Sequence, residues 1–304
     1  MDICGEREPT PVNLSVTHTV LVSIMKTEAS VSGPNMQPLL KVENLVKRYA
    51  KRTLAGTGTD LLALDTVSFT IFSGTTLAVV GESGSGKSTL ALCVACLESP
   101  TTGTIWFEGK NIVKLGERAR RQVRQQIQLI FQDPASSLNP RWSVLEILVE
   151  PLILEGKCNR EEMRQRANSL LERVGLSQNI VERLPTELSG GQRQRLAIAR
   201  ALALEPKLLI LDEALSALDC SVQAQVANLL MELQNSLGMT YLYITHDLAM
   251  AAHLADEIAV MNRGRIVEQG LTGKILKQPE HETTRQLLSA VPEMLRAAQP
   301  ELEK

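Results

Sequence analysis

The chain has 304 residues, of which 44% are hydrophobic and 22% are charged, values typical of a soluble globular protein with one large or two small domains. A formal net charge of -2 argues against a broad nucleic-acid-binding surface, and no apolar run is long enough to cross a bilayer. The five cysteines are an odd number in a chain without a recognisable secretory signal, so we interpret them as reduced thiols of a cytosolic protein.

Residues 1–35 show neither a core pattern nor a motif. Their mildly apolar part, residues 16–25, is interrupted by polar side chains and follows an acidic segment, which makes it a poor signal peptide. Met25 and Met36 are both plausible alternative starts. We therefore expect residues 1–35 to be disordered or absent from the native product.

The first ordered elements are expected to be strands. Residues 39–45 alternate between apolar and polar side chains, which indicates a strand that ends at Tyr49, and a second alternating strand is expected at residues 67–71. Residues 76–80 form a short apolar run that is typical of a buried strand. Residues 90–97 contain neither Gly nor Pro and predict a helix.

The segment GESGSGKST lies between that buried strand and that helix. It matches the phosphate-binding P-loop pattern G-x-x-x-x-G-K-[ST] in the context that the pattern requires. Its residues are Gly81, Glu82, Ser83, Gly84, Ser85, Gly86, Lys87, Ser88 and Thr89. Glycines let successive backbone N–H groups point at phosphate oxygens, and the helix N-terminus adds partial positive charge. We expect Lys87 to reach the β- and γ-phosphates and the Ser88 hydroxyl to bind Mg²⁺. The alternative, a Gly/Ser-rich surface turn, does not account for the flanking elements.

Two features near the P-loop have structural interpretations. Cys93 and Cys96 resemble half of a metal site, but no second pair stands at a suitable spacing, so we expect both to pack as small apolar groups on one helix face. Residues 118–124 are rich in arginine and lie between expected strands at 104–107 and 127–131. We interpret them as a solvated helix face rather than a ligand site.

The second half of the chain alternates between helical and extended patterns. Helical spacing occurs at residues 144–154 and 161–174, and Gly175 follows as a C-cap. Further strands are expected at 208–211, 241–244 and 258–261, with helices at 222–237 and 248–254 between them. This alternation indicates a mostly parallel sheet. Residues 262–265 predict a hairpin turn, and the tail from residue 271 is helical and charged.

Two carboxylates, Asp212 and Glu213, directly follow the apolar strand at residues 208–211. In a P-loop fold this strand lies beside the P-loop strand, so both acids are expected at the carboxyl edge of the sheet. We expect Asp212 to hold the Mg²⁺ shell and Glu213 to orient and deprotonate the attacking water.

The segment LSGGQ at residues 188–192 is a second motif. Ser189 is a good N-cap, Gly190 and Gly191 allow close backbone approach, and a helix is expected over residues 193–204. The result would be a second helix N-terminus suited to an anion. Taken alone, the motif is also compatible with an ordinary capped helix after a turn that binds no anion.

Together these motifs resemble the ATP-binding-cassette (ABC) ATPases, in the same order and spacing, over about residues 39–270. The resemblance rests on the P-loop, Gln132, LSGGQ, the strand with its two acids, SALD at residues 216–219, and His246. It implies an α/β fold: a P-loop NTPase (RecA-like) core with a mostly parallel sheet, an N-terminal antiparallel β subdomain and an inserted α-helical subdomain at about residues 134–200. The ATPase domain would span residues 36–270, and residues 271–304 would form a C-terminal helical extension.

The resemblance also implies roles for individual residues and two cofactors, ATP and Mg²⁺. Gln132 would sense Mg²⁺ and the γ-phosphate, His246 would contact the γ-phosphate beside Glu213 and Lys87, and Tyr49 would stack on adenine. Ser189, Gly190, Gly191 and Gln192 of one subunit would close over the nucleotide held by the P-loop of another. Without the resemblance, Tyr49 and His246 would be read as packing or surface residues.

A finer resemblance concerns residues 131–141, FQDPASSLNPR, and residues 284–292, TRQLLSAVP. Both are similar to the peptide/nickel importer branch of ABC ATPases, especially its second ATPase subunit. The branch usually has His-Pro-Tyr-Thr where this chain has HETT at residues 281–284, and it commonly has Pro where Ala214 stands. The cysteine-rich tail that carries an iron–sulfur cluster in some members is absent from this sequence, so we expect no cluster.

The implied partners are two transmembrane permease subunits, a second and different ATPase subunit, and, indirectly, a solute-binding protein. The chain would be a peripheral protein at the cytoplasmic face of the inner membrane. Which solute is imported cannot be read from this sequence. The rival interpretations are a DNA-maintenance or translation cassette, which would carry a coiled coil or a second cassette, and a binding protein without turnover, which would carry a damaged motif.

Overall fold

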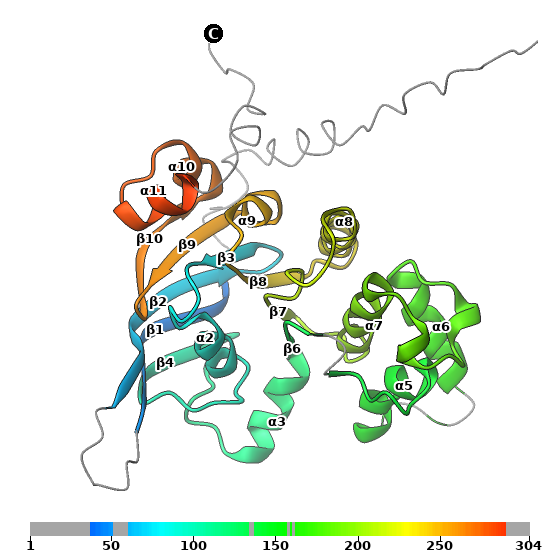
Figure 1. The fold of residues 1–304 in the computed structure, drawn as a ribbon. Helices are drawn as coiled ribbons and strands as arrows, with labels where there is room; N and C mark the ends of the chain where they lie inside the picture. The colour runs from blue at the N-terminus through cyan, green and yellow to red at the C-terminus, as the bar shows by residue number, and fades with distance from the viewer. Residues whose placement is uncertain (1–36, 51–59, 134–136, 157–158, 160–161, 290–304) are drawn as a thin grey trace, which may run out of the picture.

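The computed structural model describes residues 37–50, 60–133, 137–156, 159 and 162–289. The expectation for residues 1–35 lies outside this range. Two sheets and a separate helical block make up the described part of the chain (Figure 1).

The larger sheet has six strands in the order β10-β9-β3-β8-β7-β6. All neighbouring pairs are parallel except β9 and β10. The bounds are β3 Thr76–Val80, β6 Ile127–Ile130, β7 Leu208–Asp212, β8 Thr240–Thr245, β9 Glu257–Asn262 and β10 Arg265–Leu271. Every residue of β3, β7 and β8 is buried, as continuous apolar runs in a parallel sheet predict. The carboxyl ends of β3, β7 and β8 therefore form one edge, where the motifs follow.

The smaller sheet is antiparallel and has the order β2-β1-β4-β5. Its strands are β1 Pro38–Tyr49, β2 Leu61–Phe72, β4 Thr102–Phe107 and β5 Lys110–Asn111. Alternate side chains of β1 and β2 are buried, because one sheet face packs on α2 (Lys87–Val94) and on the larger sheet, in a shared core. β2 begins at Leu61, six residues before the expected start, because residues 61–64 pair with the end of β1.

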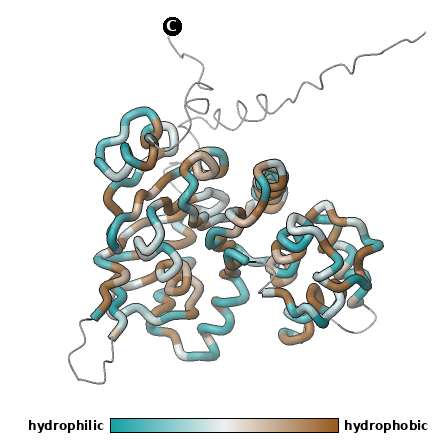
Figure 2. The backbone as a smooth tube through the Cα atoms, in the orientation of Figure 1, coloured by the Kyte–Doolittle hydropathy of each residue, from teal (hydrophilic) through white to brown (hydrophobic). Residues whose placement is uncertain are grey.

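A helical block is inserted between β6 and β7 and stands beside the sheets in Figure 1. It contains α5 Val144–Leu154, α6 Met163–Arg173, α7 Gly190–Leu202 and the short 3₁₀ helices Gln178–Ile180 and Pro185–Glu187. Ser143 and Glu146 form a capping box at the start of α5, and Gly175 adopts a φ of 65° after α6, the C-cap conformation that glycine favours. The apolar faces of these helices join the core under β7 and β8. In Figure 2, apolar residues follow the strands, whereas α3 (Glu117–Gln126) is hydrophilic.

The remaining helices are α8 Cys220–Leu237, α9 Leu248–Leu254, α10 Thr272–Lys277 and α11 Glu282–Ser289. α10 and α11 lie over the β9–β10 edge of the larger sheet (Figure 1). None of the helices in the described ranges combines the length and apolarity needed to cross a bilayer.

Candidate functional site

The P-loop connects β3 to α2 at the carboxyl edge of the larger sheet. α2 begins at Lys87, about one turn earlier than its sequence pattern suggested, because Gly86 takes the N-cap position with a φ of 106°. The helix N-terminus therefore lies directly at the loop, where its free N–H groups and partial positive charge favour an anion.

Two P-loop glycines are required because neighbouring backbone approaches them closely. A Cβ atom on Gly81 would lie 2.2 Å from the Met261 carbonyl oxygen, and one on Gly86 would lie 2.3 Å from the Ala63 carbonyl oxygen. Gly84 has open space around it but adopts a φ of 80°, which side chains rarely tolerate. The loop is thus enclosed by β9 on one side and β2 on another.

Polar groups inside the loop suit a phosphate. Lys87 is buried, and its Nζ donates to the carbonyl oxygens of Gly81 and Glu82, at 2.8 Å each. Burial lowers the pKa of Lys87, while the carboxylates of Glu213 and Asp212 oppose that shift. The buried Ser85 Oγ has no hydrogen-bond partner among the described residues. A bound phosphate would accept hydrogen bonds from both the Ser85 hydroxyl and the Lys87 ammonium.

The Ser88 hydroxyl lies against a carboxylate from β7. Ser88 Oγ donates to Asp212 Oδ1 at 3.1 Å. Burial raises the pKa of Asp212, and the nearby Glu213 adds to this, while the Ser88 hydrogen bond and Lys87 oppose it. A hydroxyl and a carboxylate side by side are oxygen ligands of the type that Mg²⁺ prefers, so these two residues fit the ion that the sequence predicts.

Glu213 is held in an unusual backbone conformation. Its φ of 48° lies in the left-handed region, which costs a residue with a side chain about 1–2 kcal/mol. Its N–H donates to the Ile244 carbonyl at 2.9 Å, and its carbonyl accepts the Ser216 hydroxyl at 2.8 Å, so both neighbouring segments fix it. The Glu213 carboxylate lies 3.6 Å from His246 Nδ1, with the Glu213 side chain 19% exposed and His246 56% exposed. This acid can therefore reach a water at the sheet edge.

Gln132 and Tyr49 each lie at or just after the end of a strand, Gln132 after β6 and Tyr49 at the end of β1. Gln132 is exposed and follows β6, whose parallel pairing places Ile130 opposite Leu211, so the backbone of Gln132 runs beside the two acids. Tyr49 ends β1, and its ring lies under the Lys47 ammonium, with 4.8 Å from Nζ to the ring centre. A ring with a cation on one face can still stack on adenine with its other face. The stacking of Tyr49 on adenine stays a prediction.

The LSGGQ motif forms the N-terminus of α7, with Ser189 as N-cap, as expected, and with a full capping box. The helix begins at Gly190, three residues before the expected start, because the two glycines and Gln192 form its first turn, and it ends at Leu202, two residues before the expected end. Gln192 N donates to Ser189 Oγ at 3.3 Å, and Ser189 N donates to Gln192 Oε1 at 2.9 Å. A Cβ on Gly191 would lie 2.6 Å from Val222 Cγ1, whereas the nearest atom to a Cβ on Gly190 is 3.7 Å away. In Figure 1, α7 stands apart from α2, so one chain does not bring this helix N-terminus to its own P-loop.

The arginine feature takes the form expected, but the cysteine feature does so only in part. α2 ends at Val94, before the expected end at residue 97, so Cys96, with a φ of 57°, lies after the helix and does not share a helix face with Cys93. Cys93 is buried and Cys96 partly buried, and burial raises the pKa of the Cys93 thiol to about 12. None of the described residues form a cluster of His, Cys, Asp and Glu that could hold a metal ion. The α3 arginines lie at the surface, where Arg121 pairs with Glu155 of the helical block at 3.0 Å.

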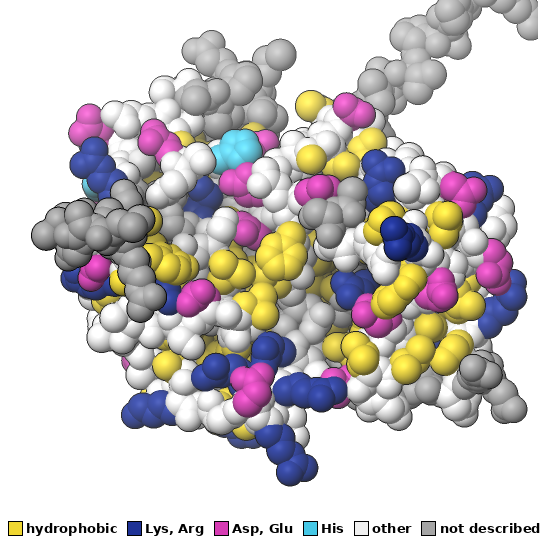
Figure 3. All heavy atoms as spheres, turned by 60° about the horizontal axis from the view of Figure 1, so that its bottom comes forward, with side chains coloured by type: hydrophobic (Ala, Val, Ile, Leu, Met, Phe, Trp, Pro, Cys, Tyr) yellow, Lys and Arg dark blue, Asp and Glu magenta, His cyan; other side chains and the backbone are white. Residues whose placement is uncertain are grey.

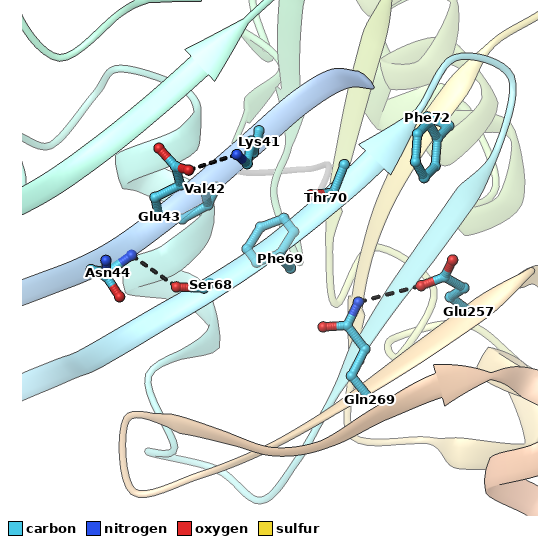
Figure 4. A pocket seen from close by; sticks show the side chains of 10 residues that line it. All are labelled: Lys41, Val42, Glu43, Asn44, Ser68, Phe69, Thr70, Phe72, Glu257 and Gln269. Carbon is cyan, nitrogen blue, oxygen red and sulfur yellow. Dashed lines mark hydrogen bonds and ion pairs between the residues drawn. The ribbon is translucent and has the colours of Figure 1, made fainter. Parts of the chain in front are cut away.

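Two hollows lie away from the P-loop. A groove of about 540 Å³ separates β6 from α5 and α7 and is lined by Gln128, Phe131, Glu150, Leu154, Glu155 and Arg200, among others. On the face shown in Figure 3, apolar side chains gather beside a hollow. A shallower pocket of about 410 Å³ lies against β1, β2 and β10 (Figure 4). Its charged groups already pair with neighbours, as Lys41 does with Glu43 at 2.6 Å, and it contains none of the motif residues.

Some residues that shape the site carried no sequence signal of that role. The backbone carbonyl oxygens of Met261 and Ala63 lie against the P-loop, and any residue at these two positions would supply such an oxygen. The turn at residues 262–265 was expected as a turn, but its contact with Ser85 was not, since no local pattern encodes a contact 179 positions away.

Comparison with known proteins adds to these observations. Residues 64–216 match the ABC transporter family. The dipeptide transport ATP-binding protein DppF of Escherichia coli (strain K12) is 47% identical over 259 residues, which cover 85% of this chain and 78% of that protein. The oligopeptide transport ATP-binding protein OppD of Mycobacterium tuberculosis is 44% identical over 273 residues, 88% of this chain and 44% of that protein.

Solved structures have the same fold. The dimeric post-hydrolysis structure of the ATP-binding cassette MJ0796, bound to ADP and Pi, has a TM-score of 0.68 at 31% identity, covering 77% of this chain and 98% of that one. CbiO1 of Clostridium perfringens, part of the ABC transporter complex cbiONQ, has a TM-score of 0.69 at 31% identity, covering 86% of this chain and 98% of that one.

Proposed function

The chain belongs to the ABC transporter family, and from that premise we propose that it is the ATP-hydrolysing subunit of an importer for peptides or a related small solute. The reaction is hydrolysis of ATP to ADP and phosphate, coupled to transport. One observation carries the catalytic part of this proposal: Ser88, Asp212, Glu213 and His246 come from three different strand ends and meet beside the P-loop. The solute class is supported by relatives named for dipeptide and oligopeptide transport.

The P-loop would bind the phosphates of ATP. Its N–H groups and the N-terminus of α2 would receive the anionic oxygens, and Lys87 would exchange its carbonyl partners for the β- and γ-phosphates. Ser88 and Asp212, with Gln132, would hold Mg²⁺, which neutralises charge on the phosphates when bound. Tyr49 would stack on the adenine.

Glu213 would act as the general base on the attacking water. A carboxylate 3.6 Å from His246 can take the water proton while the imidazole remains available to the γ-phosphate. The fixed backbone of Glu213 keeps the carboxylate at the sheet edge without a conformational search. Phosphoryl transfer needs little more from the protein than such positioning and charge stabilisation.

A complete site would need a second subunit. The Ser189 loop of one subunit, with Gly190, Gly191 and Gln192, would close over the nucleotide on the P-loop of the other. The lack of a close neighbour at Gly190 supports this role: the nearest atom to a Cβ there would be Leu218 Cδ2 at 3.7 Å, so a phosphate from outside the chain can approach that backbone. The sequence at residues 131–141 favours a different ATPase subunit as partner over a second copy of this chain.

The helical block would transmit the nucleotide state to two permease subunits. Its groove against β6 is lined by Phe131, the residue directly before Gln132, and Phe131 and Leu154 at the groove are 43% and 64% exposed. Apolar side chains exposed around a hollow mark an interaction surface. The chain would thus lie on the cytoplasmic face of the inner membrane as a peripheral subunit, and a solute-binding protein would act on it only through the permease.

Peptide-dependent ATPase activity tests the function. The chain, its partner ATPase and the permease are reconstituted in proteoliposomes with a peptide-loaded binding protein. We expect ATP hydrolysis to rise at least tenfold over the isolated chain. Hydrolysis that is equally fast without the permease would contradict an importer function while leaving the ATPase intact.

A further inference from the structure

The turn between β9 and β10 lies directly against the P-loop. Arg263 and Gly264 have φ values of 46° and 82°, the pair of positive angles that a tight hairpin turn requires. Gly264 N donates to the Ser85 carbonyl at 2.8 Å, and Asp65 N donates to the Gly264 carbonyl at 2.8 Å. One glycine therefore joins the P-loop to β2.

An ion pair holds this turn in place. Arg265 Nε donates to Asp65 Oδ2 at 2.7 Å, and Arg265 Nη2 forms an ion pair with the same oxygen at 2.6 Å. A hydrogen bond between charged groups is stronger than one between neutral groups. The turn is consequently anchored to β2 of the antiparallel sheet.

The C-terminal helix α11 holds the turn from the other side. Asn262 Nδ2 donates to Thr283 Oγ1 at 3.0 Å, and Thr283 is buried in the first turn of α11. Glu268 of β10 accepts hydrogen bonds from the backbone N–H groups of Glu280 and His281, at 2.8 and 2.9 Å, and from the Thr284 hydroxyl. α11 is therefore docked independently of the turn, through Glu268, and contacts the turn through Thr283.

We propose that Thr283, Asn262, Gly264 and the Asp65–Arg265 pair are positioning residues for the P-loop, through which docking of α11 sets the affinity for nucleotide. Ser85 lies in the middle of the loop, and its carbonyl orientation determines where the following N–H groups point. The N–H groups of the P-loop must be ordered to bind phosphate. If the turn no longer supports Ser85, ordering these groups costs free energy when nucleotide binds, and the dissociation constant rises. The acids and His246 lie on β7 and β8, so the chemical step is left unchanged.

This inference rests on nucleotide binding alone and not on the solute or the permease. The isolated full-length chain is titrated with MgATP, and its dissociation constant is measured together with the melting temperature. Arg265→Gln removes the ion pair from a side chain that is 67% exposed, so the fold should survive. The matched control is Arg164→Gln, which breaks the exposed Arg164–Glu182 pair of the helical block, 3.1 Å long, with an arginine that is 65% exposed.

A second pair of variants tests the α11 contact. Thr283→Val keeps the side-chain shape and removes the hydroxyl, and Thr283→Ser restores a hydroxyl. We expect Arg265→Gln and Thr283→Val to weaken MgATP binding by roughly 3- to 10-fold, the range for one lost hydrogen bond. Arg164→Gln and Thr283→Ser should stay within about twofold of the wild type. The kcat of the assembled transporter at saturating ATP should be unchanged in all four.

Three results would overturn the proposal. One is a dissociation constant within twofold of wild type for both Arg265→Gln and Thr283→Val. Another is equal weakening by Arg164→Gln, which would indicate a general charge effect. The third is a fall in kcat with no change in MgATP affinity. If Thr283→Val does not fold, Arg265→Lys, which keeps the charge but loses the Nε hydrogen bond, must weaken binding on its own.

Discussion

Ser88 and Asp212 are 124 positions apart in the sequence, yet the Ser88 hydroxyl donates a 3.1 Å hydrogen bond to the Asp212 carboxylate. Residue 88 lies in the first turn of the helix that follows β3, and residue 212 ends β7, two strands away from β3 in the sheet. The sheet order therefore creates the pair, because parallel strands bring their carboxyl ends to one edge. Several testable properties depend on this contact and on those around it.

The first prediction concerns the stability cost of Asp212. Burial raises the pKa of this carboxyl, so the folded protein binds its proton more tightly than the unfolded chain does. The protonated Asp212 carboxyl therefore adds to the free energy of unfolding at low pH. This contribution is lost as the pH rises above about 3.9, the pKa of an Asp in an unfolded chain. Asp212→Asn should raise the melting temperature of the nucleotide-free protein at neutral pH by about 2 °C and flatten this part of the pH dependence.

The same variant should lose Mg²⁺-dependent ATP hydrolysis, since an amide is a weaker ligand for a hard cation. Thermal denaturation at several pH values and an ATPase assay check both halves. A variant that melts lower than wild type at pH 7 would show that Asp212 stabilises the empty site.

The second prediction separates binding from turnover. Glu213→Gln should bind MgATP normally and lose turnover by about 10²- to 10⁴-fold, because the amide cannot accept a proton. Glu205→Gln is the matched control, since Glu205 also has a positive φ, 53°, but is exposed on a loop before β7. Turnover within a few-fold of wild type for Glu213→Gln would exclude Glu213 as the base.

The third prediction distinguishes the two glycines of LSGGQ. Gly190→Ala adds a methyl group where the chain itself leaves space, so folding and ATP binding by the isolated chain should be unchanged. Partner-stimulated hydrolysis should nevertheless fall at least tenfold, because the methyl group meets the partner's nucleotide. Gly191→Ala should instead lower the melting temperature, since its Cβ would lie 2.6 Å from Val222 Cγ1. If Gly190→Ala hydrolyses ATP normally with the partner, the composite site is wrong.

The fourth prediction addresses the permease surface. A cysteine at Leu154, which is 64% exposed at the groove, should crosslink to a cysteine in a cytoplasmic loop of the permease. Leu237→Cys is the control, because Leu237 is 47% exposed but ends α8 away from the groove. Equal crosslinking from both positions would count against the groove.

The sequence predicted the elements whose signal is local. The apolar runs at β3 and β8 and the helices α5 and α9 appear within one residue of the expected bounds. The predicted start of α2 was wrong by about one turn, because Lys87, Ser88 and Thr89 belong to the loop motif although their backbone is already helical. The length of β2 was missed because residues 61–66 become a strand only by pairing with β1.

The site was predictable as a set of residues but not as a geometry. The motifs named Ser88, Asp212, Glu213 and His246, and the structure adds the distances that join them. The left-handed backbone of Glu213 and the support of Ser85 by Gly264 depend on contacts between distant segments, for which the sequence carries no periodic pattern. Long-range backbone contacts of this kind are independent of side-chain identity, so composition and spacing do not reveal them.

The central claim, that this chain drives solute import by hydrolysing ATP, is tested most directly by uptake into proteoliposomes. The vesicles contain the permease, the partner ATPase and this chain, with a labelled dipeptide and its binding protein outside and ATP inside. We expect accumulation with the wild-type chain and loss of at least nine-tenths of it with Glu213→Gln, while Glu205→Gln transports normally. Accumulation at the wild-type rate with Glu213→Gln, or with this chain left out, would contradict the claim.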